Sequence, residues 1–184
     1  MTLRRIAGFL ILMVVAAAPS LAASPPPEST AAREEAAKLA KLPPVTPRAI
    51  DHSGRKQAGR GSYYAKHFAH RKTASGSRLD TNSNAAASKT LPFGTTAKVT
   101  NLSNGKSALV KVEDRGPFVR GRVVDVTPKV ADELGLGKAG VTPVEVAPIA
   151  VPQRDGAVKL GAGAADASPQ EVAAATETAR AAAR

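Results

Sequence analysis

The residue best suited to acid–base chemistry lies in a tight turn of this 184-residue chain. Asp114 begins the segment Asp114-Arg-Gly-Pro-Phe118, in which an acid and a base are neighbours. Gly116 accepts a positive φ, and Pro117 fixes its own φ while restricting the residue before it, so the chain turns sharply. A sharp turn presents polar groups rather than burying them, so Asp114 is a candidate functional residue. The alternative is that Asp114 only caps the turn through its own backbone.

Two further groups of polar residues are weaker candidates. Asp125 lies close before a helix start, where it either satisfies backbone donors or orients a groove together with Arg122. His67 and His70 are three residues apart, near Asp80, but two possible ligands without a third at matching spacing do not predict a metal site. Their surroundings are basic and typical of a solvated loop. We therefore expect neither a metal nor a cofactor.

The candidate residues require strands on both sides of the turn. Val110-Lys-Val112 precedes the turn and Val123-Val-Asp-Val126 follows it, and both are rich in the β-branched residues that favour strands. Asp114 and Arg115 would thus lie at the mouth between two strands. The dipeptide Asn104-Gly105 is a strong hairpin signal. In all, strand-like runs are present at 61–64, 96–100, 108–112, 123–126 and 141–146.

One convincing helix lies within this region. Thr127 is a good N-cap, Pro128 suits the first helical position, and Gly135 would end the helix. Short strands, tight turns and one helix predict a small, mostly antiparallel β-barrel. We place this domain at residues 61–149, which are just enough to bury a modest core.

The two ends of the chain differ in composition from this domain. Residues 1–23 combine Arg4 and Arg5 with a short apolar run and small residues, which is typical of a secretory signal peptide. Residues 24–60, rich in Pro, Ala, Glu and Lys, are expected to form a disordered linker. Residues 150–184 are expected to be a disordered, alanine-rich tail with at most one short helix, because a second core needs more chain.

The absence of cysteine and the positive charge narrow the setting. Without cysteine, neither a disulfide nor a lipid anchor is expected. The predicted signal peptide indicates an exported protein of the periplasm or envelope. We also expect a monomer. The formal net charge of +11 would attract it to anionic polymers and lipid head groups, and export argues against nucleic acid as a partner. Five of the six aromatic residues lie in the barrel region, where they either line a groove or fill the core. Tyr63 and Tyr64 are adjacent on a strand, so at most one of them lines a groove.

Six different short motifs follow one another along this region. They are Gly61-Ser-Tyr-Tyr-Ala65, Thr73-Ala-Ser-Gly76 with Asp80, Thr90-Leu-Pro-Phe-Gly-Thr95, Val99-Thr-Asn-Leu102 with Asn104-Gly-Lys106, Asp114-Arg-Gly-Pro-Phe118 and Gly121-Arg-Val-Val-Asp125. Together they resemble the rare lipoprotein A (RlpA) family. The resemblance implies a mostly β fold, a six-stranded double-psi β-barrel shared with expansins, with one or two short helices and disordered tails on either side. We expect neither the lipid anchor nor the SPOR-type targeting domain that family members often carry.

The resemblance also implies an activity on peptidoglycan in the bacterial envelope. Some members are lytic transglycosylases that prefer glycan strands stripped of stem peptides. They cleave the bond between N-acetylmuramic acid and N-acetylglucosamine without water, because the sugar's own 6-hydroxyl closes on C1 and leaves a 1,6-anhydro end. One acid can suffice, since the nucleophile is intramolecular. The hypothesis is an endolytic transglycosylase in cell-wall remodelling and daughter-cell separation; the alternative is a non-catalytic, expansin-like wall-binding module.

The resemblance assigns roles to individual residues. Asp114 is implied as the acid, and Asp80 as its partner, because Ser77 occupies the family's second acid position. Ser88 occupies the position of a family histidine. Both serines favour the non-catalytic alternative, since a serine is no proton donor at a useful pKa. The predicted substrate-binding residues are Tyr64, Ser77, Ser88, Arg115 and Asp125.

Overall fold

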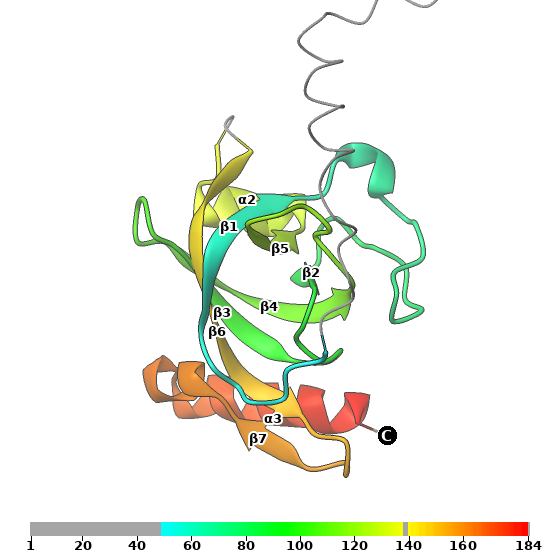
Figure 1. Cartoon of the computed structure of the whole chain (residues 1–184), viewed down its shortest axis with the longest axis vertical. Helices are drawn as coiled ribbons and strands as arrows, with labels where there is room; N and C mark the ends of the chain where they lie inside the picture. Colours follow the sequence, from blue (N-terminus) through cyan, green and yellow to red (C-terminus); the bar gives the residue numbers. More distant parts are fainter. Residues whose placement is uncertain (1–48, 138–139, 184) are drawn as a thin grey trace, which may run out of the picture. The chain divides into compact units, whose positions relative to one another are not determined.

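The computed structural model describes residues 49–137 and 140–183 (Figure 1). The predicted signal peptide and residues 24–48 of the predicted linker lie outside the described residues. Within the described ranges, no helix combines the length and the apolarity needed to cross a membrane. The elements in chain order are β1 (Gln57–Tyr63), η1 (Lys66–Phe68), β2 (Ala85–Ser88), β3 (Thr96–Asn101), β4 (Ser107–Asp114), β5 (Arg122–Val126), α2 (Pro128–Leu134), β6 (Val141–Pro152), β7 (Val158–Leu160), η2 (Ala162–Asp166) and α3 (Pro169–Ala182).

Strands β1 to β6 close into a barrel around a common interior (Figure 1). Their order is β1-β5-β2-β4-β3-β6, and β6 pairs back onto β1. The pairs β1/β5 and β2/β4 are parallel, whereas β1/β6, β2/β5, β3/β4 and β3/β6 are antiparallel. This closed and mostly antiparallel arrangement confirms the six-stranded double-psi β-barrel that the resemblance implied.

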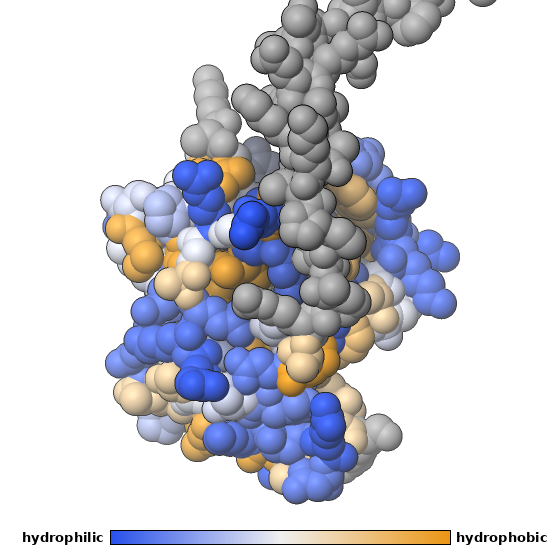
Figure 2. All heavy atoms as spheres, in the orientation of Figure 1, coloured by the Kyte–Doolittle hydropathy of each residue, from blue (hydrophilic) through white to orange (hydrophobic). Residues whose placement is uncertain are grey.

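Small and β-branched side chains fill the barrel. Ala97 and Val99 on β3, and Val110 and Val112 on β4, are buried, and less buried residues lie between them. This alternation is the pattern of a strand with one face toward a core. The face in Figure 2 is mainly hydrophilic, with apolar residues in separate small patches. The apolar core therefore lies inside the barrel, and polar residues remain available around it.

Strand β2 was not predicted from the sequence. Its four residues, Ala85 to Ser88, are all buried, because β2 lies between β4 and β5. Alanine is depleted in strands, so a run of three alanines gives no strand signal. Here small side chains are needed because the strand is surrounded on both faces.

The predicted helix is confirmed as α2. Thr127 is its N-cap, with an extended ψ of 159°, and the Thr127 hydroxyl accepts a hydrogen bond from the Val130 N–H. Pro128 is the first helical residue, and Gly135 ends the helix in the left-handed region with φ 64°. Val130 and Leu134 are buried in the core cluster of the barrel. Sequence signals for the helix ends were sufficient here because each end has its own cap.

The C-terminal residues are ordered, so the prediction of a disordered tail from residue 150 is wrong for them. β6 continues to Pro152, and β7 pairs with it. A capping box of Ser168 and Glu171 begins α3. A second apolar cluster joins this helix to β6 through Ile149, Ala150, Ala175 and Ala179. The segment was expected to be too short for a second core, but its small alanine side chains let α3 pack closely against β6 and share one apolar cluster with it.

The predicted linker also extends too far. β1 begins at Gln57, before the expected domain start at residue 61. Residues 49–56 are tied to the barrel as well, since the Asp51 N–H donates to the Thr90 carbonyl at 2.7 Å and His52 Nδ1 lies 2.8 Å from the Pro152 carbonyl. Polar residues dominate this segment, which is why its composition resembled a linker.

Candidate active site

The turn that follows β4 has the sharp geometry that its sequence predicts. Gly116 has a φ of 133°, a value that residues with a side chain rarely adopt, and its peptide bond with Pro117 is cis. Both residues are buried, whereas the next residue, Phe118, is 64% exposed. The turn thus holds Asp114 half-buried at the end of β4.

Three donors converge on the Asp114 carboxylate. Its Oδ1 accepts hydrogen bonds from the backbone N–H groups of Ala74 and Arg115, each at 2.8 Å. Its Oδ2 accepts one from the Tyr64 hydroxyl at 3.2 Å. These bonds fix the plane of the carboxylate. Oδ1 accepts two short N–H bonds and Oδ2 only one longer bond, so Oδ2 is the oxygen with room to carry a proton.

The carboxylate lies in a cavity of about 330 Å³. The cavity is at the small end of ligand-binding clefts, so it suits part of a chain rather than a large ligand. A second cavity of about 530 Å³ lies beside α3 and is lined by three alanines together with Lys111, Glu177 and Thr178. Asp114 does not line that second cavity, and we therefore place the candidate site in the smaller one. Its lining residues are Tyr64, Phe68, Arg71, Lys72, Thr73, Leu79 and Asp114.

Tyr64 serves as a hydrogen-bond donor rather than as an acid. Burial raises the pKa of the Tyr64 hydroxyl, and the adjacent Asp114 carboxylate raises it further. The phenol therefore stays neutral at any physiological pH and keeps its proton directed at Asp114. Tyr64 was predicted to bind substrate, and the structure places it in the cavity wall. The neighbouring Tyr63 is 38% exposed and does not line the cavity.

An exposed aromatic ring forms another side of the cavity. Phe68 is 38% exposed, and its ring centroid lies 6.3 Å from that of Tyr64. The guanidinium carbon of Arg71 lies 5.5 Å from the centroid of the Phe68 ring. Of the two roles open to the aromatic residues, Phe68 has the exposure of a stacking surface and not the burial of a core residue. Arg71 and Lys72 give this surface a positive charge.

Arg115 holds the turn in place. Its Nη1 donates to the carbonyls of Ser88 and Leu91, at 3.1 and 2.8 Å. Its guanidinium carbon lies 3.7 Å from the centroid of the Phe93 ring. Burial lowers the pKa of Arg115, and the Asp114 carboxylate opposes that change. The predicted role of Arg115 near the substrate finds no support in this geometry, because the guanidinium is engaged with its own chain.

Ser88 is likewise part of the scaffold. It is 2% exposed, and its hydroxyl accepts a hydrogen bond from the Leu91 N–H at 3.2 Å. Ser88 does not line the cavity around Asp114. The prediction that it binds substrate therefore has no geometric support.

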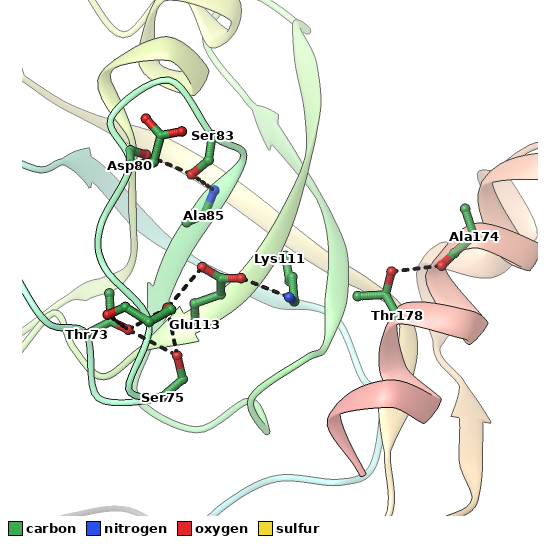
Figure 3. A network of polar contacts seen from close by, with 10 residues as sticks. Thr73, Ser75, Asp80, Ser83, Ala85, Lys111, Glu113, Ala174 and Thr178 are labelled. Carbon is green, nitrogen blue, oxygen red and sulfur yellow. Dashed lines mark hydrogen bonds and ion pairs between the residues drawn. The ribbon is translucent and has the colours of Figure 1, made fainter. Parts of the chain in front are cut away.

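Asp80 is not brought to Asp114. Its Oδ1 accepts from the Asn82 N–H at 2.8 Å, and its carbonyl accepts from the Ser83 hydroxyl at 2.7 Å, which is a local turn of the kind that Asp commonly forms. Asp80 is exposed, does not line the cavity, and lies with Ser83 apart from the network around Glu113 (Figure 3). Within the described residues, no group of three His, Cys, Asp or Glu side chains could hold a metal ion.

Asp125 links two strands below the site. Its Oδ1 accepts hydrogen bonds from the Ser62 hydroxyl on β1 and from Arg122 Nη2 on β5. The predicted pairing of Asp125 with Arg122 is therefore present. The Asp125 side chain is 16% exposed and does not line the cavity. Its contacts fit a role in joining the parallel strands rather than a contact with substrate.

Glu113 is the polar residue that the sequence did not indicate. Its Oε2 accepts from the Ser77 hydroxyl at 3.4 Å, and its Oε1 pairs with Lys111 Nζ at 2.9 Å. The hydroxyls of Thr73, Ser75 and Ser77 lie 2.9 to 3.1 Å from one another, beside this carboxylate (Figure 3). On a regular strand Glu113 and Asp114 would point to opposite faces, so their adjacency gave no reason to group them. The one sequence feature that could have indicated Glu113 is its position directly before Asp114.

A sequence model described as lytic transglycolase matches residues 56–146. The barrel domain therefore resembles the lytic transglycolase family over these residues. Over 85 residues the chain is 47% identical to the probable endolytic peptidoglycan transglycosylase RlpA of Synechocystis sp., covering 46% of this chain and 26% of that protein. Over 90 residues it is 44% identical to the endolytic peptidoglycan transglycosylase RlpA of Neisseria meningitidis serogroup A, covering 49% of this chain and 38% of that protein. The resemblance to the RlpA family is confirmed.

The chain spans only about a quarter to two fifths of the length of these relatives. Among solved structures, a crystal structure of an expansin from Clavibacter michiganensis is 18% identical and gives a TM-score of 0.42. It covers 53% of this chain and 52% of that chain.

The resemblance implies that two positions of the candidate site depart from the family pattern. The serine expected at the second acid position, Ser77, contacts Glu113, and the serine expected at the histidine position, Ser88, is buried. Asp114, which the resemblance implies as the family aspartate, is the acid in the cavity wall. A second carboxylate, Glu113, accepts a hydrogen bond from the Ser77 hydroxyl.

Proposed function

We propose that this protein is a peptidoglycan lytic transglycosylase that cleaves glycan strands lacking stem peptides, with Asp114 as the proton donor. The observation that supports this most is the Asp114 carboxylate in a cavity whose wall combines an exposed aromatic ring with two cationic side chains. The relatives named above are endolytic peptidoglycan transglycosylases. In this proposal the protein acts in the bacterial envelope. The processes it serves are cell-wall remodelling and daughter-cell separation.

The proposed reaction moves two protons and exchanges one bond for another. Asp114 Oδ2 gives its proton to the oxygen that links the two sugars, and the bond from C1 to that oxygen breaks. The 6-hydroxyl oxygen of the same muramic acid forms a new bond to C1 and loses its proton to a base. No water is consumed, because the nucleophile belongs to the substrate, and an intramolecular nucleophile lowers the demand on the protein. The Ala74 and Arg115 N–H groups stabilise the carboxylate that remains.

The charge around the cavity suits a glycan without peptides. Each muramic acid that has lost its peptide carries a free lactyl carboxylate. Arg71 and Lys72 line the cavity and supply positive charge at short range. The net charge of +11 over the whole chain attracts anionic wall polymers at longer range, and salt weakens that attraction.

The test is digestion of stem-peptide-free glycan strands by the purified protein, followed by mass analysis of the strand ends. The wild type is expected to release products with 1,6-anhydro ends. Asp114→Asn is expected to lower the rate by at least about 100-fold, because general acid catalysis contributes about 10²- to 10⁴-fold. Asp132→Asn, the same change on the exposed surface of α2, is the matched control and is expected to cleave normally.

A second candidate function is a non-catalytic, expansin-like module that binds peptidoglycan. The presence of serine at two family positions, Ser77 and Ser88, favours it. This alternative predicts that the wild type and Asp114→Asn both sediment with the glycan and that neither releases anhydro ends. Release by the wild type alone excludes it.

A further inference from the structure

We propose that Glu113 is the second carboxylate of the site, and that it receives the proton of the 6-hydroxyl through the hydroxyls of Thr73 and Ser77. This inference rests on the proposed function, and it assigns the base that the reaction needs. It also explains how the site works with serine at position 77. The steps that support it are the backbone at Glu113, the chain of hydroxyls and the charge at Lys111.

The backbone at Glu113 departs from a regular strand. β4 pairs with the parallel strand β2 with Val112 opposite Ala86 and Asp114 opposite Ala87, so Glu113 has no partner and the register shifts. An extra residue of this kind is a β-bulge, which redirects side chains and is frequent next to active sites. The strict alternation that would place Glu113 and Asp114 on opposite faces therefore does not hold at this point. Both residues meet the same loop, residues 73–77.

That loop is anchored to both acidic residues. The Ala74 N–H donates to Asp114 Oδ1 at 2.8 Å, and the Ser75 N–H donates to the Glu113 carbonyl at 3.1 Å. The loop thus bridges from one acidic residue to the next. A loop hydroxyl that contacts the Glu113 carboxylate is therefore held at a fixed position relative to the Asp114 carboxylate.

The hydroxyls on the loop connect Glu113 to the cavity. The Ser77 hydroxyl donates to Glu113 Oε2 at 3.4 Å and lies 2.9 Å from the Thr73 hydroxyl. Thr73 is 6% exposed and lines the cavity that contains Asp114. A hydroxyl both donates and accepts, so each one can pass a proton on as it receives another. The path from the cavity to Glu113 therefore consists of two hydroxyls.

Lys111 orients the Glu113 carboxylate for this role. Lys111 Nζ lies 2.9 Å from Oε1, while Oε2 faces Ser77. The carboxylate is 22% exposed, so it retains access to solvent. In the reaction, Asp114 loses its proton to the leaving oxygen, and the 6-hydroxyl proton passes to Thr73, from Thr73 to Ser77 and from Ser77 to Glu113. Exchange with solvent then returns a proton to Asp114 and removes one from Glu113, which completes the cycle.

The experiment measures kcat and KM on stem-peptide-free glycan strands across a range of pH. Glu113→Gln is expected to lower kcat by at least tenfold with little change in KM, and to remove the acid limb of the pH profile. Ser77→Ala is expected to give the same fall in kcat, because it breaks the path. Glu133→Gln, a matched change on the exposed face of α2, is expected to behave as the wild type. The exchange variant, Ser77→Glu with Glu113→Gln, is expected to recover activity by returning the acid to the loop.

Three results would overturn the inference. The first is a Glu113→Gln variant with the kcat and the acid limb of the wild type, which leaves the proposed function intact. The second is a lower melting temperature and a higher KM with an unchanged pH profile, which assigns Glu113 a structural role only. The third is a wild type that releases no anhydro ends, which removes the proposed function and this inference together.

Discussion

The Tyr64 hydroxyl, which donates a hydrogen bond to Asp114, makes the stability of the protein depend on pH in the alkaline range. Burial and the Asp114 carboxylate both raise the pKa of the Tyr64 hydroxyl. An unfolded tyrosine ionises near pH 10, whereas the folded one keeps its proton to higher pH. The folded state therefore binds more protons than the unfolded state above about pH 10, and its stability declines there.

We expect Tyr64→Phe to remove this decline. Below about pH 10 the wild type is the more stable protein, by about 1 kcal/mol, because Phe loses the hydrogen bond to Asp114. As the pH rises above 10, this advantage falls by up to about 1.4 kcal/mol per pH unit. Urea unfolding of both proteins from about pH 7 to 11 measures the difference, and Tyr63 is common to both. A difference that stays constant to pH 11 contradicts the expectation.

At the scale of single residues, the sequence indicated the acid whose turn is marked by neighbouring glycine and proline residues. Glycine and proline predicted the turn at Asp114, and the structure has that turn, with Asp114 in the cavity wall. Glu113 was missed because a β-bulge between parallel strands is set by pairing with β2, which is distant in the sequence. The expected partnership of Asp80 with Asp114 finds no support, because Asp80 forms a local turn with Asn82 and does not line the cavity.

At the scale of the elements, one hydroxyl joins α2 to the barrel. Thr127 is fully buried, and its hydroxyl donates to the Ser83 carbonyl at 2.6 Å, just before β2. The same oxygen accepts from the Val130 N–H at 3.5 Å, in the first turn of α2. A helix cap and a strand entrance thus depend on one atom. The position of β2, which carries Ser88, follows from this contact.

We expect Thr127→Val to lower the free energy of unfolding by about 1 to 2 kcal/mol. Valine keeps the shape but removes the cap and leaves the Ser83 carbonyl and the Val130 N–H without this partner. Thr127→Ser retains the hydroxyl and is the control, with a smaller loss from one missing methyl group. Chemical denaturation of the three proteins measures the effect. Equal stability of the valine and serine variants would show that the hydroxyl contributes nothing.

The sequence predicted some of the strands better than others. Four of the expected strand regions lie within β3, β4, β5 and β6, because β-branched residues, valine above all, are frequent there. β1 begins earlier than expected and β6 ends later, since polar and proline residues at their ends conceal strands that are held by pairing. β2 carries no propensity signal at all, and only the closed barrel requires a strand at that place.

At the scale of the whole molecule, the barrel has a second layer beyond the lytic transglycolase match. That match ends at residue 146, whereas β6 continues to Pro152 and is followed by β7 and α3. Figure 1 shows α3 and β7 together on one side of the barrel. Alanines at 175 and 179 lie against Ile149 and Ala150 of β6. Composition could not predict this layer, because the alanines contribute through close approach and not through large apolar area.

Placing a charge in this contact tests whether the second layer stabilises the barrel. Ala179 is 0% exposed, so Ala179→Arg forces a cation and extra volume between α3 and β6. We expect α3 to separate from β6 and the free energy of unfolding to fall by about 3 kcal/mol or more, as Ile149 and Ala150 become exposed. Ala173→Arg places the same residue on the exposed face of α3, and its effect is expected to stay within about 0.5 kcal/mol. Thermal unfolding together with hydrogen exchange at α3 and β6 measures both effects. If the two variants unfold alike and the amides of α3 exchange freely in the wild type, the segment is a tail after all and the barrel is complete without it.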